Sequence, residues 1–279
     1  MGISDETRRF TKRFDETESE LLILTGAIGQ GAGKGGKDVL WTASVGIIAF
    51  LDVNSKELVT QKATLKWLAT EEDKGRNWIH SFEQLCIYRV LVKKTLQYED
   101  TIEDGAPQIL EFMLLEVLKK EENEQLFAVK EAYLKPVILE DEIAHALTLE
   151  RAFSNFEGAI TWMEHDCNLF LDTDEVGCES AKSAIKTFHC LMRNMKIWDD
   201  KMKTFAAQEL TESANDWQEE AKTQLTQEDF KKRMVIRELS ICLEGKFEVY
   251  ASDDDMFFGH VIIVSGNINA GIEDAYIAG

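Results

Sequence analysis

The spacing of hydrophobic and polar positions changes near the middle of the chain. Before about residue 142, apolar residues alternate with polar ones or form short runs bounded by turns, which is typical of β-strands. Between Glu179 and Leu210 the apolar residues recur at three- and four-residue steps, the period of an α-helix. Strand-like runs return near the C-terminus. The pattern predicts a β-rich module over 1–142 and an α+β module over 143–279.

The first module reads as a succession of short strands. Most of these runs are rich in β-branched and aromatic residues and are separated by charged or glycine-containing loops. We therefore expect a barrel or a strongly curved antiparallel sheet. The predicted strands are Leu40–Leu51, Glu57–Leu68, Ile79–Thr95, Phe112–Lys119 and Leu126–Leu139.

The second module combines hairpin and helix signals, which predicts helices packed on an antiparallel sheet. A long helical stretch over Glu179–Leu210 is expected to break near Lys196–Asp200, and Thr226–Asp229 has the spacing of a capping box that starts a short helix. The predicted strands are Phe156–Trp162, Cys167–Leu171, Leu239–Tyr250 and Met256–Val264.

Charge narrows the classes of partner. The 279 residues include 31 Lys and Arg against 51 Asp and Glu, a formal net charge of −20. Nucleic acids and anionic membranes bind clustered basic residues, so we expect neither as a partner. A basic protein would be attracted instead. The alternative is that the charge only keeps the protein soluble.

The lack of recognisable targeting signals and the pattern of cysteines predict a cytoplasmic protein. No apolar run approaches the ~18 residues of a membrane helix, and the N-terminus lacks the apolar core of a secretory signal. The five cysteines are dispersed and contain no CxxC pair, which is typical of reduced thiols.

The glycine-rich loop Gly26–Asp38 contains the spacing GxxxxGK of a phosphate-binding loop. Asp38 stands where that motif needs a hydroxyl for magnesium, and a carboxylate there would repel phosphate. The residues that follow are strand-like, so no helix N-terminus would face an anion. We therefore expect a loop between strands and no bound nucleotide, although its lysines leave a contact with an acidic ligand open.

Asp253, Asp255 and His260 are the best candidates for catalytic chemistry. Adjacent carboxylates repel one another and can raise a pKa, and the histidine could act as a base. In an extended chain Asp253 and Asp255 would share one side. The alternative is a hairpin turn, since Asp favours turns. The spacing of histidines, cysteines and acids elsewhere fits no known metal site, and we expect no metal and no cofactor.

The C-terminal block carries a family resemblance. The segments Asp253–His260, Val261–Asn267 and Ala275–Gly279 resemble the end of the bacterial "domain of unknown function 2262" family, and the likeness extends over about residues 145–279. The first half, with Trp41 and Trp67 among its residues, resembles an N-terminal companion of that domain. The family has no established activity, so the resemblance implies no catalytic residue.

These observations favour a non-enzymatic, cytoplasmic bacterial protein that binds a basic protein partner in an immunity-like or regulatory role. The alternative is a metal-assisted hydrolase that uses the Asp253–His260 segment. A homo-oligomeric structural protein is the third reading. The net charge supports the first reading. The sequence also shows no evident nucleophile or cofactor motif, which favours binding over catalysis.

Overall fold

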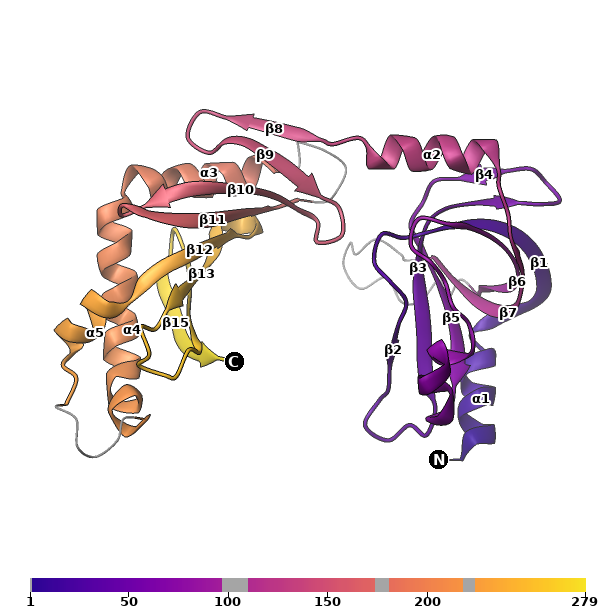
Figure 1. Cartoon of the computed structure of the whole chain (residues 1–279), viewed down its shortest axis with the longest axis horizontal. Coiled ribbons are helices and arrows are strands. Elements are labelled where there is room, and N and C mark those ends of the chain that lie inside the picture. The colour runs from indigo at the N-terminus through magenta and orange to yellow at the C-terminus, as the bar shows by residue number, and fades with distance from the viewer. Residues whose placement is uncertain (1, 97–109, 174–180, 218–223) are drawn as a thin grey trace. The chain divides into compact units, whose positions relative to one another are not determined.

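The computed structural model describes residues 2–96, 110–173, 181–217 and 224–279. The chain divides into two compact units, Met1–Lys135 and Pro136–Gly279 (Figure 1). The second unit begins at Pro136, whereas the sequence pattern predicts the boundary near residue 142. Each unit has its own core and is described separately.

The N-terminal unit consists mainly of strands. Its elements are α1 (Ile3–Thr11), β1 (Phe14–Thr25), β2 (Gly31–Gly33), β3 (Trp41–Asp52), β4 (Leu58–Val59), β5 (Ala63–Ala69), the three-ten segment η1 (Glu72–Ile79), β6 (Ile87–Thr95), β7 (Leu110–Lys120) and α2 (Glu124–Leu134).

Five of these strands close into a barrel, which confirms the predicted β-rich module. The hydrogen-bonded order is β1-β6-β7-β5-β3, and β3 pairs back onto β1. All pairs are antiparallel except β5–β7. The short strands β2 and β4 add to β3. Five-stranded Greek-key barrels of this kind include the OB-fold, although a fold alone assigns no ligand.

Alternating side chains fill the barrel. Val45, Leu65, Val90 and Val92 are buried in one cluster with Trp67, whose indole Nε1 donates a hydrogen bond to the Trp78 carbonyl oxygen. The alternate positions of the same strands face outward, as the period of two requires. The apolar half of each strand thus builds the core that the sequence pattern predicted.

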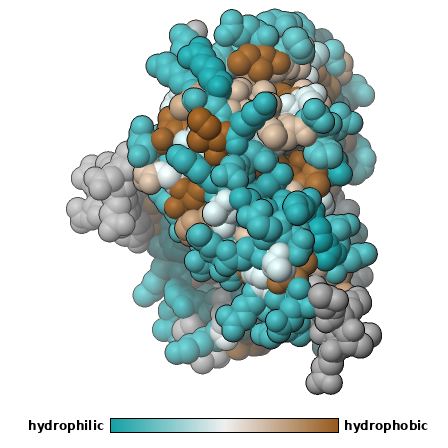
Figure 2. Space-filling view, turned by 90° about the vertical axis from the view of Figure 1, so that its left-hand side faces the viewer, coloured by the Kyte–Doolittle hydropathy of each residue, from teal (hydrophilic) through white to brown (hydrophobic). Residues whose placement is uncertain are grey.

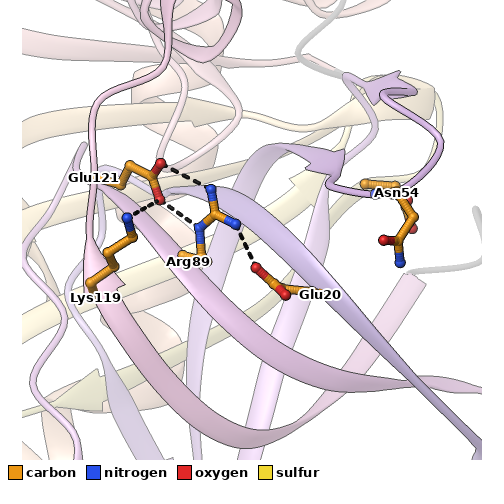
Figure 3. Close-up of polar contacts among 6 residues, drawn as sticks. Glu20, Asn54, Arg89, Lys119 and Glu121 are labelled. Carbon is orange, nitrogen blue, oxygen red and sulfur yellow. Dashed lines mark hydrogen bonds and ion pairs between the residues drawn. The ribbon is translucent and has the colours of Figure 1, made fainter.

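An ion-pair network joins three neighbouring segments of the barrel (Figure 3). The Arg89 guanidinium on β6 pairs with Glu121 at 2.6 Å, just beyond β7, and with Glu20 on β1 at 2.5 Å. Lys119 Nζ lies 3.4 Å from the same Glu121 carboxylate. The hydrogen bonds from Arg89 lower the pKa of Glu121 to about 2, so this network stays ionised well into acidic solution.

Three strand predictions in this unit are wrong in whole or in part. Of Ile79–Thr95 only the second half, β6, is a strand. Leu126–Leu139 contains helix α2 and only the first residues of a later strand. The helix is explained by its cap, because the Asn123 side chain accepts a hydrogen bond from Leu126 N at 3.0 Å. The run Glu57–Leu68 divides into β4 and the start of β5, with polar residues between them.

The C-terminal unit is an eight-stranded sheet covered by helices, which confirms the predicted α+β class. Strand order is β15-β14-β13-β12-β11-β10-β9-β8, and only β11–β12 is parallel. Its elements are β8 (Ile138–Asp141), β9 (His145–Glu150), β10 (Asn155–Trp162), β11 (His165–Asp172), α3 (Lys182–Arg193), α4 (Met195–Trp217), α5 (Gln227–Arg233), β12 (Val235–Ile241), η2 (Leu243–Gly245), β13 (Lys246–Ser252), β14 (Val261–Asn267) and β15 (Gly271–Ala278).

The helices explain the single parallel pair. A parallel connection needs a crossover, and α3, α4 and α5 all lie in the segment between β11 and β12. Helix α3 packs on β11 and β12, and α4 packs on β14 and β15. The core between helices and sheet includes Trp162, whose Nε1 donates a hydrogen bond of 2.9 Å to the buried Asp199. The predicted helix break occurs at Asn194, two residues before the expected range.

The predicted single strand Leu239–Tyr250 is instead two antiparallel strands, β12 and β13. The chain reverses at η2, where Glu244 has φ 59° and Gly245 has φ 80°. The alternation of apolar and polar residues continues across this reversal, which hides it in the sequence. Only Gly245 signals a left-handed turn residue there.

No helix in the described part of the chain is long and apolar enough to cross a membrane. Four cysteines, Cys86, Cys167, Cys190 and Cys242, are free thiols, and Cys178 lies outside the described residues.

Candidate functional site

Asp253, the first of the predicted site residues, is an organiser of the turn between β13 and β14. Its side chain is buried, and its two carboxylate oxygens accept hydrogen bonds from three backbone N–H groups: Phe257 at 2.7 Å, Gly259 at 3.2 Å and Asp255 at 3.3 Å. A carboxylate that accepts three backbone hydrogen bonds stabilises the turn that supplies the donors. Asp253 therefore has a structural role in this turn.

The structure does not bring Asp253, Asp255 and His260 together around a shared space. Asp255 is exposed and has φ 60°. The His260 ring lies edge-on to the Trp217 indole at 5.1 Å, and its Nδ1 is 2.6 Å from the Phe257 carbonyl oxygen. No group of three or more His, Cys, Asp or Glu side chains that could hold a metal ion occurs among the described residues.

The glycine loop Gly26–Asp38 contacts the barrel through Lys34 and through its C-terminal end. Lys34 Nζ lies 5.4 Å from the centre of the Trp41 ring and 3.7 Å from the Glu71 carboxylate. The buried Glu6 carboxylate accepts hydrogen bonds from the N–H groups of Val39 and Leu40, directly after the loop. These contacts fit a structural connection between strands.

Negative charge is concentrated in the C-terminal unit. Residues 1–135 contain 18 Lys and Arg against 23 Asp and Glu, a net charge of −5. Residues 136–279 contain 13 Lys and Arg against 28 Asp and Glu, a net charge of −15. A partner attracted by charge would therefore approach the C-terminal unit.

The sheet of this unit has one face against the helices and one face that we call the open face. On β10 to β14, the side chains buried against the helices alternate with half-buried or exposed ones. The alternate positions define the open face. Among the described residues, the helices of this unit all lie on the opposite side of the sheet.

Carboxylates gather on the central strands of the open face. The set consists of Glu157 on β10, Asp172 on β11, Glu238 on β12 and Glu248 on β13. The strand register places Glu157 opposite Phe170, Phe170 opposite Ser240, and Ser240 opposite Glu248. In the adjacent row Asn168 pairs with Glu238, and Glu238 pairs with Tyr250. We call these four acids, with Tyr250, the acidic row.

Burial disfavours the charge on three of these acids, Glu157, Asp172 and Glu238. It raises the pKa of Glu157, with a further contribution from Glu150, and it raises the pKa of Glu238, to which the charge of Glu157 adds. Burial also raises the pKa of Asp172 and, with a hydrogen bond to Glu248, that of Tyr250 to about 12. Burial raises the pKa of Cys242, beside Asp172, to about 11. The ionised form of these acids is therefore less favourable on the open face than it would be in water.

No acid of the acidic row forms an ion pair within the described residues. The neighbouring Asn155 on β10, opposite Asp172, has a buried Oδ1 that accepts no hydrogen bond. Carboxylates and an amide oxygen all accept hydrogen bonds. The face is therefore suited to a ligand that brings positively charged donors.

Sequence reasoning missed the acidic row because its members are far apart along the chain. Each acid occupies a polar position of an alternating strand, where a solvated side chain is the ordinary expectation. Their approach depends on the parallel pairing of β11 with β12, which no sequence period encodes. In the sequence, the acidic row is indicated only by acids at polar positions of the strands, such as 157, 238 and 248.

The raised pKa of Glu238 predicts a stability difference that depends on pH. An acid whose pKa is higher in the folded state favours folding fully below its unfolded pKa of about 4.3, and this contribution is lost as the pH rises through the folded value. Glu238→Gln should therefore be more stable than the wild type at neutral pH, and the difference should vanish below about pH 4. Urea unfolding across this range measures it, with the exposed Glu273→Gln as control. A variant less stable than the wild type at neutral pH would contradict the account.

Comparison with protein families assigns both units. Residues 141–277 match the family model described as "Uncharacterized protein conserved in bacteria (DUF2262)". Residues 6–133 match a separate model, "Domain of unknown function (DUF7021)". Searches of curated proteins and of solved structures gave no match. The family resemblance noted for the C-terminal half is confirmed, together with its N-terminal companion. The C-terminal unit therefore matches the DUF2262 model, and the N-terminal unit, which contains the barrel, matches the DUF7021 model.

Proposed function

We propose that this protein binds a basic protein partner through the acidic row of its C-terminal unit. The observation that carries the proposal is the pair Glu157 and Glu238: both are half-buried, both have raised pKa values, and neither forms an ion pair among the described residues. Lysine or arginine side chains of a partner would supply the missing charge. Binding would then relieve a cost that the free protein carries.

Long-range attraction supports the same function. The unit that carries the acidic row has a net charge of −15. Complementary charge speeds the encounter of two proteins, and this effect decreases at high ionic strength. An isologous contact between two copies through this face would bring carboxylates together, which disfavours self-association there. A basic partner of another kind is the better match.

The biological setting that fits this chemistry is immunity-like or regulatory. A protein that covers a basic, functional surface of a partner, such as a nuclease domain, would block the surface that meets nucleic acid. It needs no catalytic residue of its own. It needs a shaped acidic face, and the open face of the sheet supplies one.

The alternative function, a metal-assisted hydrolase at the Asp253–His260 segment, has less support. Asp253 uses its carboxylate to hold three backbone N–H groups of its own turn. Asp255 is exposed, and the His260 ring packs on Trp217. This geometry favours a turn with a binding role over a catalytic centre.

Co-purification from the native host at low ionic strength tests the proposal. We expect the full-length protein to retain a basic protein that is released as salt increases. The double variant Glu157→Gln/Glu238→Gln should retain much less of it, while Glu273→Gln should behave as the wild type. Recovery of no basic protein at low salt, or equal recovery by the double variant, would contradict the proposal.

A further inference from the structure

Two aromatic side chains are exposed together on the C-terminal unit. The Phe258 side chain is 68% exposed and that of Trp217, at the end of α4, is 38% exposed. Their rings stack with centroids 5.9 Å apart and planes 26° apart. The side of this unit that carries α4 is largely hydrophilic and interrupted by separate apolar patches (Figure 2). An exposed stacked pair on such a surface is a candidate contact for a partner.

The turn holds Phe258 outward at a conformational cost. Asp253 caps the turn, and the side chains of Met256 and Phe257 are buried, at 1% and 0% exposure. The next residue then points to solvent with φ 55°. This left-handed conformation is unusual for a bulky side chain and is common for Asn and Gly. Such strain occurs often at ligand-binding positions.

Trp217 packs against Phe258 and links it to the buried side chains of the turn. Its indole meets the buried Phe257 ring edge-on at 5.6 Å and the His260 ring edge-on at 5.1 Å. The pair is therefore a rigid platform connected to the core of the unit. Preorganised aromatic side chains contribute much of the binding energy at protein interfaces because little conformational freedom is lost on binding.

Acidic residues stand close to the two rings along the chain, since Asp216 directly precedes Trp217 and Asp255 is three residues before Phe258. Asp216 and Asp255 are exposed, and neither forms an ion pair within the described residues. Asp254 is paired with Arg233 at 2.8 Å. Carboxylates beside an aromatic face favour a cation, because the ring attracts the cation and the acids neutralise it. A guanidinium group satisfies both, since it stacks on aromatic rings and donates to carboxylates.

We propose that Phe258 and Trp217 form an anchor for an arginine side chain of the basic partner. The inference rests on the proposed function and adds a contact to it. The guanidinium stacks on the exposed face of Phe258 and donates hydrogen bonds to the carboxylate of Asp255. The anchor lies on the side of the unit that carries α4 and the acidic row lies on the open face, so the two are separate contacts with a basic partner.

The probe for this anchor is a fluorescently labelled peptide of alternating arginine and glycine, with its citrulline counterpart as the neutral control. Citrulline keeps the shape of arginine and lacks the charge. Fluorescence anisotropy at low ionic strength measures the affinity of the full-length protein for each peptide. We expect the arginine peptide to bind and the citrulline peptide to bind at least about tenfold more weakly.

Phe258→Asn removes the ring and places a residue that accepts the left-handed conformation. We expect its affinity for the arginine peptide to fall about five- to tenfold, with no decrease in the urea midpoint of unfolding. Phe153→Asn is the matched control, because Phe153 is 71% exposed on the same unit and forms no ring contact among the described residues. The control should bind as the wild type.

The outcomes separate the anchor from the proposed function. If Phe258→Asn binds as tightly as Phe153→Asn, or the citrulline peptide binds as tightly as the arginine peptide, the anchor is wrong. If Glu157→Gln/Glu238→Gln still weakens binding in that case, the acidic row stands without the anchor. Concentration-dependent dimers that Phe258→Asn abolishes would show a second copy as the occupant and would overturn the inference.

Discussion

Replacing Asp253 by alanine is expected to lower the free energy of unfolding by about 3 kcal/mol, because it removes the acceptor of the buried Phe257 N–H and of two half-buried N–H groups. The carboxylate receives the N–H groups of Phe257 and Gly259 as well as the weaker contact from Asp255. Asp253→Asn keeps one acceptor oxygen and should cost about 1 kcal/mol. Urea unfolding followed by circular dichroism measures both changes.

Asp255→Asn is the matched control for this experiment. Asp255 is exposed in the same turn and Asn accepts its left-handed backbone (φ 60°), so this replacement should change the free energy of unfolding by less than about 0.5 kcal/mol. An Asp253→Ala variant as stable as the wild type would show that the carboxylate does not organise the turn. That result would return Asp253 to the candidates for catalysis.

Much of the fold follows from local patterns in the sequence. The hairpin of β10 and β11 is predicted because apolar residues alternate on both sides of the four residues 163–166. In the structure the turn is shorter, Met163–Glu164, and both of its φ angles are positive. The capping box at Thr226 is also confirmed, with its Oγ1 accepting a hydrogen bond from Asp229 N at 3.2 Å. In both cases the physical cause lies within a few neighbouring residues.

Other features depend on contacts between distant residues. The closure of the barrel requires β1 to pair with both β3 and β6, and β1 begins at Phe14, inside a charged stretch that gives no apolar signal. Because Asp favours turns, a hairpin turn at Asp253 is one prediction from the sequence, but the three N–H donors to its buried carboxylate come together only in the fold. The acidic row needs the register of four strands. Sequence periodicity contains neither.

Both proposed contacts contain residues in environments that are unfavourable for folding. Glu157 and Glu238 are half-buried acids that form no ion pair in the described structure, and Phe258 is an exposed aromatic residue with a left-handed backbone. Such environments cost stability in the free protein, and proteins retain them mainly at functional sites. Each of the two proposed contacts is therefore identified by what it costs the fold.

The double variant Glu157→Gln/Glu238→Gln is expected to have opposite effects on stability and on binding. Removing two charges that burial and mutual repulsion disfavour should stabilise the free protein at neutral pH. The same change removes charges that face the partner and should weaken binding by about tenfold or more. A purely structural role for these acids would move both quantities in the same direction.

Salt dependence provides the internal control for this variant. Wild-type affinity for a basic partner should fall as ionic strength rises, and the double variant should show a weaker dependence because it presents fewer charges. Glu273→Gln, which removes one exposed charge from β15 outside the acidic row, should reproduce the wild-type stability and bind almost as tightly.

The most direct test is the affinity of the purified full-length protein for its co-purified basic partner, measured by isothermal titration calorimetry for the wild type and for Glu157→Gln/Glu238→Gln. The account predicts that the double variant, folded and at least as stable as the wild type, binds about tenfold or more weakly at low ionic strength. An affinity equal to that of the wild type would contradict the claim that the acidic row is the binding surface.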